Sequence, residues 1–191
     1  MYPGNPDYEV EEFFSQASGS RSSKITMSTH FGTHIDAPRH AVEGGAGVDA
    51  LPLTHFYGDC RVIDATAEKE SISRELVEGS NVQQGERILF KTTNSARGLD
   101  TFYSDFVFVS ASAAAYLAQQ NVALVGIDFY SIKQKGSTDN RPHTELLSKN
   151  IPILEGINLS AVSPGTYTLI CFPLALVGLD GSPCRAVLSS Q

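Results

Sequence analysis

Three of the five histidines of this chain lie within eleven residues and share that stretch with an aspartate. The four residues are His30, His34, Asp36 and His40. Every offset between them is even, and side chains an even number of residues apart share one face of an extended strand. A helix would also bring the first two histidines together, but Gly32 and Pro38 argue against a helix. We therefore predict that three imidazoles and a carboxylate meet there, a set of ligands that suits zinc.

A second group of candidates lies more than a hundred residues further along the chain. Glu155 directly follows the apolar run 151–154, and a carboxylate at that position is expensive to bury unless it is paired or bound to a metal. The alternative is that Glu155 is simply exposed at the end of a strand. His143, twelve residues earlier, is its natural partner, whereas nothing around His55 suggests a ligand. We predict that His143 and Glu155 complete the site.

Composition limits the class of protein. The chain has 191 residues, 41% of them hydrophobic and 18% charged, which is typical of one globular domain spanning residues 1–191. The net charge of −7 disfavours a nucleic-acid partner. No apolar run is long enough for a membrane span, and the start lacks a signal segment. Cys60, Cys171 and Cys184 are far apart in sequence, so we expect free thiols and a cytoplasmic protein.

Strands outnumber helices in the expected order of elements. Strands are expected at 24–29, 59–66, 87–92, 123–129, 151–154, 166–176 and 184–189, with a turn at 178–183. Helices are expected at 71–79, 110–120 and 143–149. This order predicts an α/β (α+β) domain with a mainly β core.

Residues 30–40 read His-x-Gly-Thr-His-x-Asp-x-Pro-x-His. On this motif the chain resembles the cyclase family of metal-dependent hydrolases, whose best-described members are bacterial kynurenine formamidases and isatin hydrolases. Further resemblances extend over nearly the whole chain, at residues 2–4, 125–128, 143–155 and 180–185.

The resemblance implies a swivelling β/β/α fold, assembled as a homodimer or homotetramer. It also implies that His30, His34 and Asp36 bind one metal. Asp36 would bridge to a second metal held by His143 and Glu155, and His40 would be the catalytic general acid–base. One or two zinc ions are the implied cofactor, with manganese as the alternative.

The implied activity is hydrolysis of a small aromatic amide by metal-activated water. An aryl formamide of the N-formylkynurenine type, an intermediate of tryptophan catabolism, is the first candidate substrate. Tyr2, Phe31 and Tyr130 are the residues we expect to bind it. Two alternatives stay open: a manganese-dependent hydrolase of cyclic amides such as isatin, and a non-enzymatic member that only binds metal or ligand. The presence of His40 argues against the second, because binding a metal alone does not need it.

The chain departs from the family pattern in three places. It has no tryptophan, so Tyr2 stands at the family's aromatic position, and Asn5 replaces an aspartate. After Asp128 the family often continues Pro-Ser-x-Asp, whereas this chain has Phe129-Tyr130-Ser131-Ile132-Lys133. Relatives also have an additional N-terminal strand, which the resemblance implies is absent or trimmed here.

Overall fold

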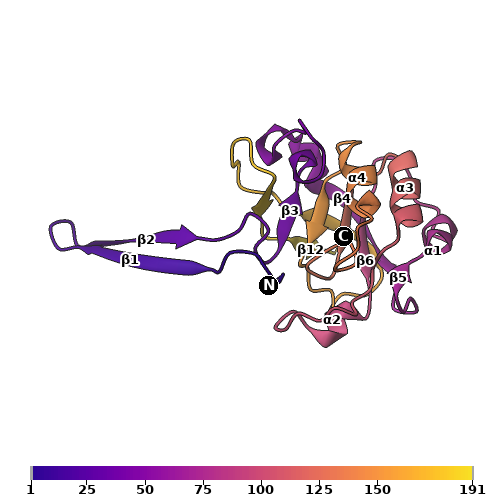
Figure 1. Ribbon diagram of the computed structural model, residues 1–191, viewed down its shortest axis with the longest axis horizontal. Coiled ribbons are helices and arrows are strands. Elements are labelled where there is room, and N and C mark those ends of the chain that lie inside the picture. Colours follow the sequence, from indigo (N-terminus) through magenta and orange to yellow (C-terminus); the bar gives the residue numbers. More distant parts are fainter. Residues whose placement is uncertain (1, 191) are drawn as a thin grey trace.

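A computed structural model describes residues 2–190 and is built around one eight-stranded mixed sheet (Figure 1). Its spatial order is β11-β3-β9-β8-β6-β4-β10-β12. The strands are β3 (His34–Asp36), β4 (Tyr57–Asp64), β6 (Arg87–Lys91), β8 (Leu124–Ile127), β9 (Ile153–Glu155), β10 (Gly165–Ile170), β11 (Gly181–Pro183) and β12 (Val187–Ser189). The four central strands, β9-β8-β6-β4, are parallel, and the outer strands pair antiparallel.

Apolar residues cover both faces of the central strands. In β6, Ile88 and Phe90 face one buried cluster, while Leu89 between them faces the other. This alternation is what a strand covered on both sides requires. The helices α1 (Arg74–Gly79), α3 (Ala111–Gln119) and α4 (Arg141–Leu147) contribute to the first cluster.

Serine side chains set the starts of two helices. Ser73 and Ser110 accept hydrogen bonds from the backbone N–H groups of Leu76 and Ala113, which would otherwise lack an intrahelical partner. The short α2 (Asn94–Arg97) lies at the end of β6, and a two-stranded parallel pair joins β5 (Ser71–Ile72) to β7 (Phe108–Val109). None of the described helices is long and apolar enough to cross a membrane.

A hairpin of β1 (Glu9–Ser15) and β2 (Ser20–Thr26) extends away from the rest of the molecule (Figure 1). Every residue of both strands is exposed. The paired register places Val10, Phe14 and Ile25 on one face of the hairpin. Phe13 lies on the opposite face, where Lys24 and Glu11 form an exposed ion pair at 3.7 Å.

The predicted mixed fold with a mainly β core is confirmed, and the helix expected at 110–120 matches α3. The turn expected at 178–183 is partly wrong, because Gly181–Pro183 form the edge strand β11. Pro183 is compatible with that position, since an edge strand leaves one row of backbone groups unpaired. The strand expected at 166–176 ends at Ile170.

Candidate metal and catalytic site

Two antiparallel strands bring the first three candidate ligands together. His34 and Asp36 lie two residues apart in β3 and share a face, and Glu155 of β9 lies directly opposite His34. Nε2 of His34 is 3.3 Å from Oδ1 of Asp36 and 3.5 Å from Oε2 of Glu155. All three side chains are buried.

His143 reaches the same place from α4. Its Nε2 atom lies 3.7 Å from Oε1 of Glu155 and 3.8 Å from Oδ2 of Asp36. We call His34, Asp36, His143 and Glu155 the donor cluster. The fold thus joins the two halves that sequence reasoning placed in one site.

The prediction that residues 30–40 form one extended strand is wrong. Only His34–Asp36 are in a strand. His30 lies in the turn before it, and His40 ends the 3₁₀ turn Pro38–His40. Pro38 breaks the strand, since its fixed φ and missing N–H suit the first position of a helical turn.

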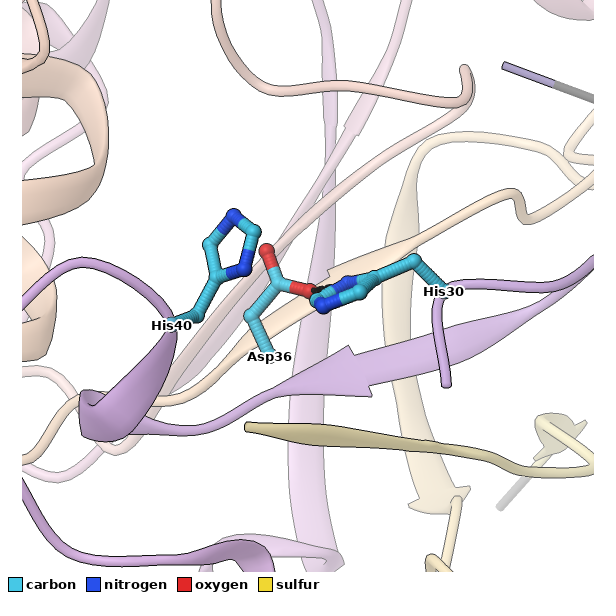
Figure 2. Close-up of side chains that lie close together, drawn as sticks. All are labelled: His30, Asp36 and His40. Atoms are coloured by element: carbon cyan, nitrogen blue, oxygen red, sulfur yellow. Dashed lines mark hydrogen bonds and ion pairs between the residues drawn. The ribbon is translucent and has the colours of Figure 1, made fainter. Parts of the chain in front are cut away.

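The imidazole rings of His30 and His40 nevertheless both lie beside the carboxylate of Asp36 (Figure 2). Nδ1 of His30 is 2.7 Å from Oδ1 of Asp36, and the ring centres of His30 and His40 are 4.2 Å apart. His30, Asp36 and His40 form one group of possible metal donors, and His34, Asp36 and Glu155 form another. Asp36 belongs to both groups, whereas sequence reasoning placed His34 with His30 and Glu155 with His143.

Two glycines allow the backbone to cross under this site. Gly32 and Gly156 have φ values of +63° and +70°, which residues with a Cβ rarely adopt. A Cβ on Gly156 would lie 2.3 Å from the carbonyl oxygen of Gly32. The hydroxyl of Thr33 donates to the carbonyl of Gly156 at 2.7 Å, which fixes β3 to the chain segment that follows Glu155.

The protonation of His34 leaves one nitrogen free for a metal. Its Nδ1 is 2.9 Å from the carbonyl oxygen of Gly32. A carbonyl only accepts hydrogen bonds, so Nδ1 carries the proton and Nε2 presents a lone pair to Asp36 and Glu155 in the neutral ring. Nε2 of His34 and Oδ2 of Asp36 are buried and have no hydrogen-bond partner among the described residues. The donor set therefore fits a cation.

The charges of the donor cluster also favour a bound cation. Burial lowers the pKa of His34, but the carboxylates of Asp36 and Glu155 outweigh it and raise the pKa to about 10. Burial raises the pKa of Asp36, yet His30 and His34 hold it well below the usual range. Two ionised carboxylates in a buried space require a positive charge beside them. In the metal-free fold the protonated ring of His34 supplies that charge, and a bound cation would displace the proton from Nε2 and take over the role.

Sequence reasoning did not select Asp180, which lies on the other side of His30. Its Oδ2 atom is 3.1 Å from Nε2 of His30 and 3.9 Å from Nδ1 of His40, and Thr29 donates to Oδ1 at 3.0 Å. The resemblance at residues 180–185 drew attention to this segment, but it did not indicate that Asp180 contacts His30, 150 residues earlier in the chain. Gly181 makes room for the contact, because a Cβ there would lie 3.1 Å from Cε1 of His30.

A cavity of about 220 Å³ opens onto the site. Its buried end includes Glu155 and His143. The half-buried residues Tyr2, Asn5, Tyr130, Lys133 and Asn140 line the rest, together with Ser131, His30 and His40. Tyr2 and Tyr130, two of the three residues predicted to bind substrate, thus line this cavity. Phe31 does not line this cavity and instead stacks on Tyr8, with ring centres 5.1 Å apart.

Comparison with known proteins places the chain in a family. A model of the family described as putative cyclase matches residues 2–134. A kynurenine formamidase of Salinibacter ruber is 37% identical over 193 aligned residues, which cover 98% of this chain and 90% of the relative. The chain therefore belongs to the putative cyclase family, as its resemblance predicted.

Solved structures agree with the family assignment. A structure described as a potential metal-dependent hydrolase with cyclase activity has a TM-score of 0.86 and 36% identity, covering 98% of this chain and 90% of that one. Isatin hydrolase A from Labrenzia aggregata has a TM-score of 0.82, covers 100% of this chain and 86% of that one, and is 24% identical, so it supports the fold alone. The protein is an enzyme of the hydrolase class, and its buried donors support a divalent metal.

Proposed function

We propose that this enzyme hydrolyses an aryl formamide, giving formate and an aromatic amine. One observation carries the proposal: a cavity with aromatic walls at Tyr2 and Tyr130 ends on the buried donor cluster. Relatives named kynurenine formamidase, matched over nearly the full chain, support the same reaction class. An N-formylkynurenine-type substrate is the first candidate, and isatin is the comparison compound.

We propose that the divalent metal is held by the predicted ligands, which are His30, His34, Asp36, His143 and Glu155. Zinc suits their mixture of imidazole nitrogen and carboxylate oxygen, and manganese is the alternative. A bound divalent cation lowers the pKa of water and polarises a carbonyl group. Asp36 and Glu155 offset the charge of the cation, and Ile132 donates its N–H to Glu155 at 2.6 Å, which fixes that carboxylate.

His40 is the residue we assign to proton transfer. It is the most exposed member of the group around Asp36, and its ring lies 5.1 Å from that of His143. Burial and the neighbouring imidazoles lower its pKa, which favours the unprotonated ring at neutral pH. Nδ1 faces Asp180, so Nε2 is the atom that would take the proton from water and return it to the departing amine nitrogen.

A direct test loads the purified protein with zinc or manganese and measures formate release from N-formylkynurenine and formanilide, with isatin opening as the comparison. The proposal expects formate from both formamides and loss of the activity with a chelator. Faster turnover of isatin than of either formamide would favour the cyclic-amide alternative. No turnover of any compound by metal-loaded protein would contradict the proposed function.

We further propose that the enzyme is a homo-oligomer held together by the hairpin. Val10, Phe14 and Ile25 form an exposed apolar face there. A two-stranded hairpin is marginally stable alone in water, and an exposed apolar face of this kind is typical of a contact with another chain. A homodimer is the simplest assembly that would cover it, and a homotetramer is the alternative.

We also propose a cytoplasmic location. Cys60, Cys171 and Cys184 are free thiols, and burial raises the pKa of Cys60 and Cys184 to about 12. Unpaired thiols are typical of a reducing compartment. Secretion of the native enzyme into an oxidising compartment, shown by fractionation, would contradict this.

A further inference from the structure

Lys133 gives the cavity a positive charge that nothing in the proposed reaction uses. Among the described lining residues, Glu155 and Lys133 are the two that carry a fixed charge at neutral pH. Glu155 is buried at the metal end, and Lys133 is half-buried. The cavity therefore has a carboxylate in its interior and an ammonium group on its wall.

The nearest candidate partner for Lys133 is already paired with another residue. Lys133 is within electrostatic range of Asp139, but the stronger contacts of that carboxylate are with Arg141, whose guanidinium donates to it at 2.7 Å and 2.9 Å. Those hydrogen bonds lower the pKa of Asp139 to about 2. Lys133 itself has no ion pair within 4 Å among the described residues. Its charge is left largely unbalanced.

Asn140 adds an unused hydrogen-bond donor to the same wall. It stands at the N-cap of α4, where an asparagine side chain normally bonds to the first turn of the helix. Here the side chain makes no capping bond, and it lines the cavity instead. Asn5 also lines the cavity, with one long hydrogen bond of 3.4 Å to the carbonyl of His30.

An ammonium group with nearby amide donors suits an anionic oxygen acid, and charge-assisted hydrogen bonds of this kind are the stronger ones. A cation on a protein of net charge −7 also concentrates anions locally. Glu155 is the one carboxylate among the described lining residues, and it already faces His34 and His143. The lining therefore offers no other carboxylate to bind an ammonium group of the ligand.

We infer that Lys133 selects aryl amides that carry a carboxylate away from the scissile bond, and that amides bearing only a positive charge are disfavoured. This inference rests on the proposed function, since it names the substrate class of the same cavity. Lys133 is a specificity residue here and takes no part in proton transfer.

The test compares three formanilides that carry a methyl, a carboxylate or an aminomethyl group at the meta or para position. We expect Lys133→Met to lower kcat/KM for the carboxylate compound about 10-fold relative to the methyl compound. Lys133→Glu should lower this ratio further and raise the relative rate of the aminomethyl compound. The matched control is Lys149→Met, which removes an exposed lysine after α4 and should leave every ratio as in the wild type.

Ratios separate substrate choice from general damage, since a loss of stability or metal lowers all three rates together. Equal ratios in wild type, Lys133→Met and Lys149→Met would overturn the inference while leaving the proposed function intact. If the metal-loaded wild type turns over none of the three and does not turn over N-formylkynurenine either, the proposed function fails. In that case calorimetry of 4-aminobenzoate against p-toluidine decides the inference: weaker binding of only the carboxylate to Lys133→Met supports it, and equal loss or no loss overturns it.

Discussion

The donor cluster and the hairpin are both incomplete in the isolated chain, but in opposite ways. The donor cluster holds buried polar atoms without a hydrogen-bond partner, at Nε2 of His34 and Oδ2 of Asp36. The hairpin exposes apolar side chains, at Val10, Phe14 and Ile25. Each arrangement is costly by itself, because buried polar groups require partners and exposed apolar surface is better removed from water.

The difference shows what each region needs. Two buried carboxylates need positive charge beside them, which the proton on His34 supplies in the metal-free fold and a divalent cation would supply in its place. An exposed apolar face needs a complementary apolar surface, which a second copy of the chain would supply in the proposed homo-oligomer. The two regions can therefore be disrupted independently.

The largest effect is expected for Asp36→Asn. The substitution keeps the shape of the side chain but removes a charge from the centre of both groups of possible metal donors. We expect metal content to fall below one ion per chain and kcat/KM to fall about 1000-fold or more. Elemental analysis and formate release measure the two. Asp7→Asn, at an exposed position next to the hairpin, is the control. Unchanged metal content in Asp36→Asn would remove this residue from the ligand set.

His40→Gln should reduce activity without emptying the site. We expect kcat to fall about 100-fold, which is the usual contribution of a positioned proton carrier, with metal content close to wild type. The control is His55→Gln, since His55 bonds to the carbonyl of Ala123 away from the cluster. Joint loss of metal and activity in His40→Gln would instead make His40 a ligand, which its place beside His30 and Asp36 also allows.

Removal of the metal should make stability depend on pH. The pKa of His34 in the metal-free fold is about 10, above the value near 6.5 of an unfolded histidine. Protonation therefore stabilises the fold fully below about pH 6.5, and this contribution is lost as the pH rises toward 10. We expect the Tm of chelated protein to fall by several degrees over that range, as measured by calorimetry. An equally steep fall in metal-loaded protein would assign the effect to other groups.

Phe14→Glu should have the smallest effect on the catalysed reaction. Its effect on self-association should be clear. A charge on the apolar face of the hairpin should weaken self-association about 10-fold or more, as measured by light scattering over a concentration series. Phe13→Glu adds the same charge on the opposite face and should weaken association less. Equal effects of the two substitutions would contradict the assigned contact face.

Local patterns indicated which residues lie together in the candidate site, because its central residues follow regular strand geometry. His34 and Asp36 share a face at a spacing of two, and Glu155 follows an apolar run, which favoured a buried carboxylate. The helix expected at 110–120 likewise begins where Ser110 accepts a hydrogen bond from the backbone N–H of Ala113. In each case the signal lies within a few residues of the feature that it predicts.

The parts that could not be predicted depend on long-range pairing. Asp180 reaches His30 because β11 pairs with β3, and nothing in the sequence around Gly181 specifies that partner. The prediction of an extended strand over residues 30–40 was wrong at its C-terminal end because Pro38 starts a 3₁₀ turn. Phe31 was assigned to the substrate by its type and position, whereas its ring lies against Tyr8.

We infer that the donor cluster binds a divalent cation. Anomalous diffraction at the zinc edge, from crystals of the protein loaded with zinc, tests it most directly. We predict an anomalous peak about 2.0–2.2 Å from Nε2 of His34 and from carboxylate oxygens of Asp36 and Glu155. Zinc bound elsewhere, or no peak beside these residues at full occupancy of the chain, would contradict the claim.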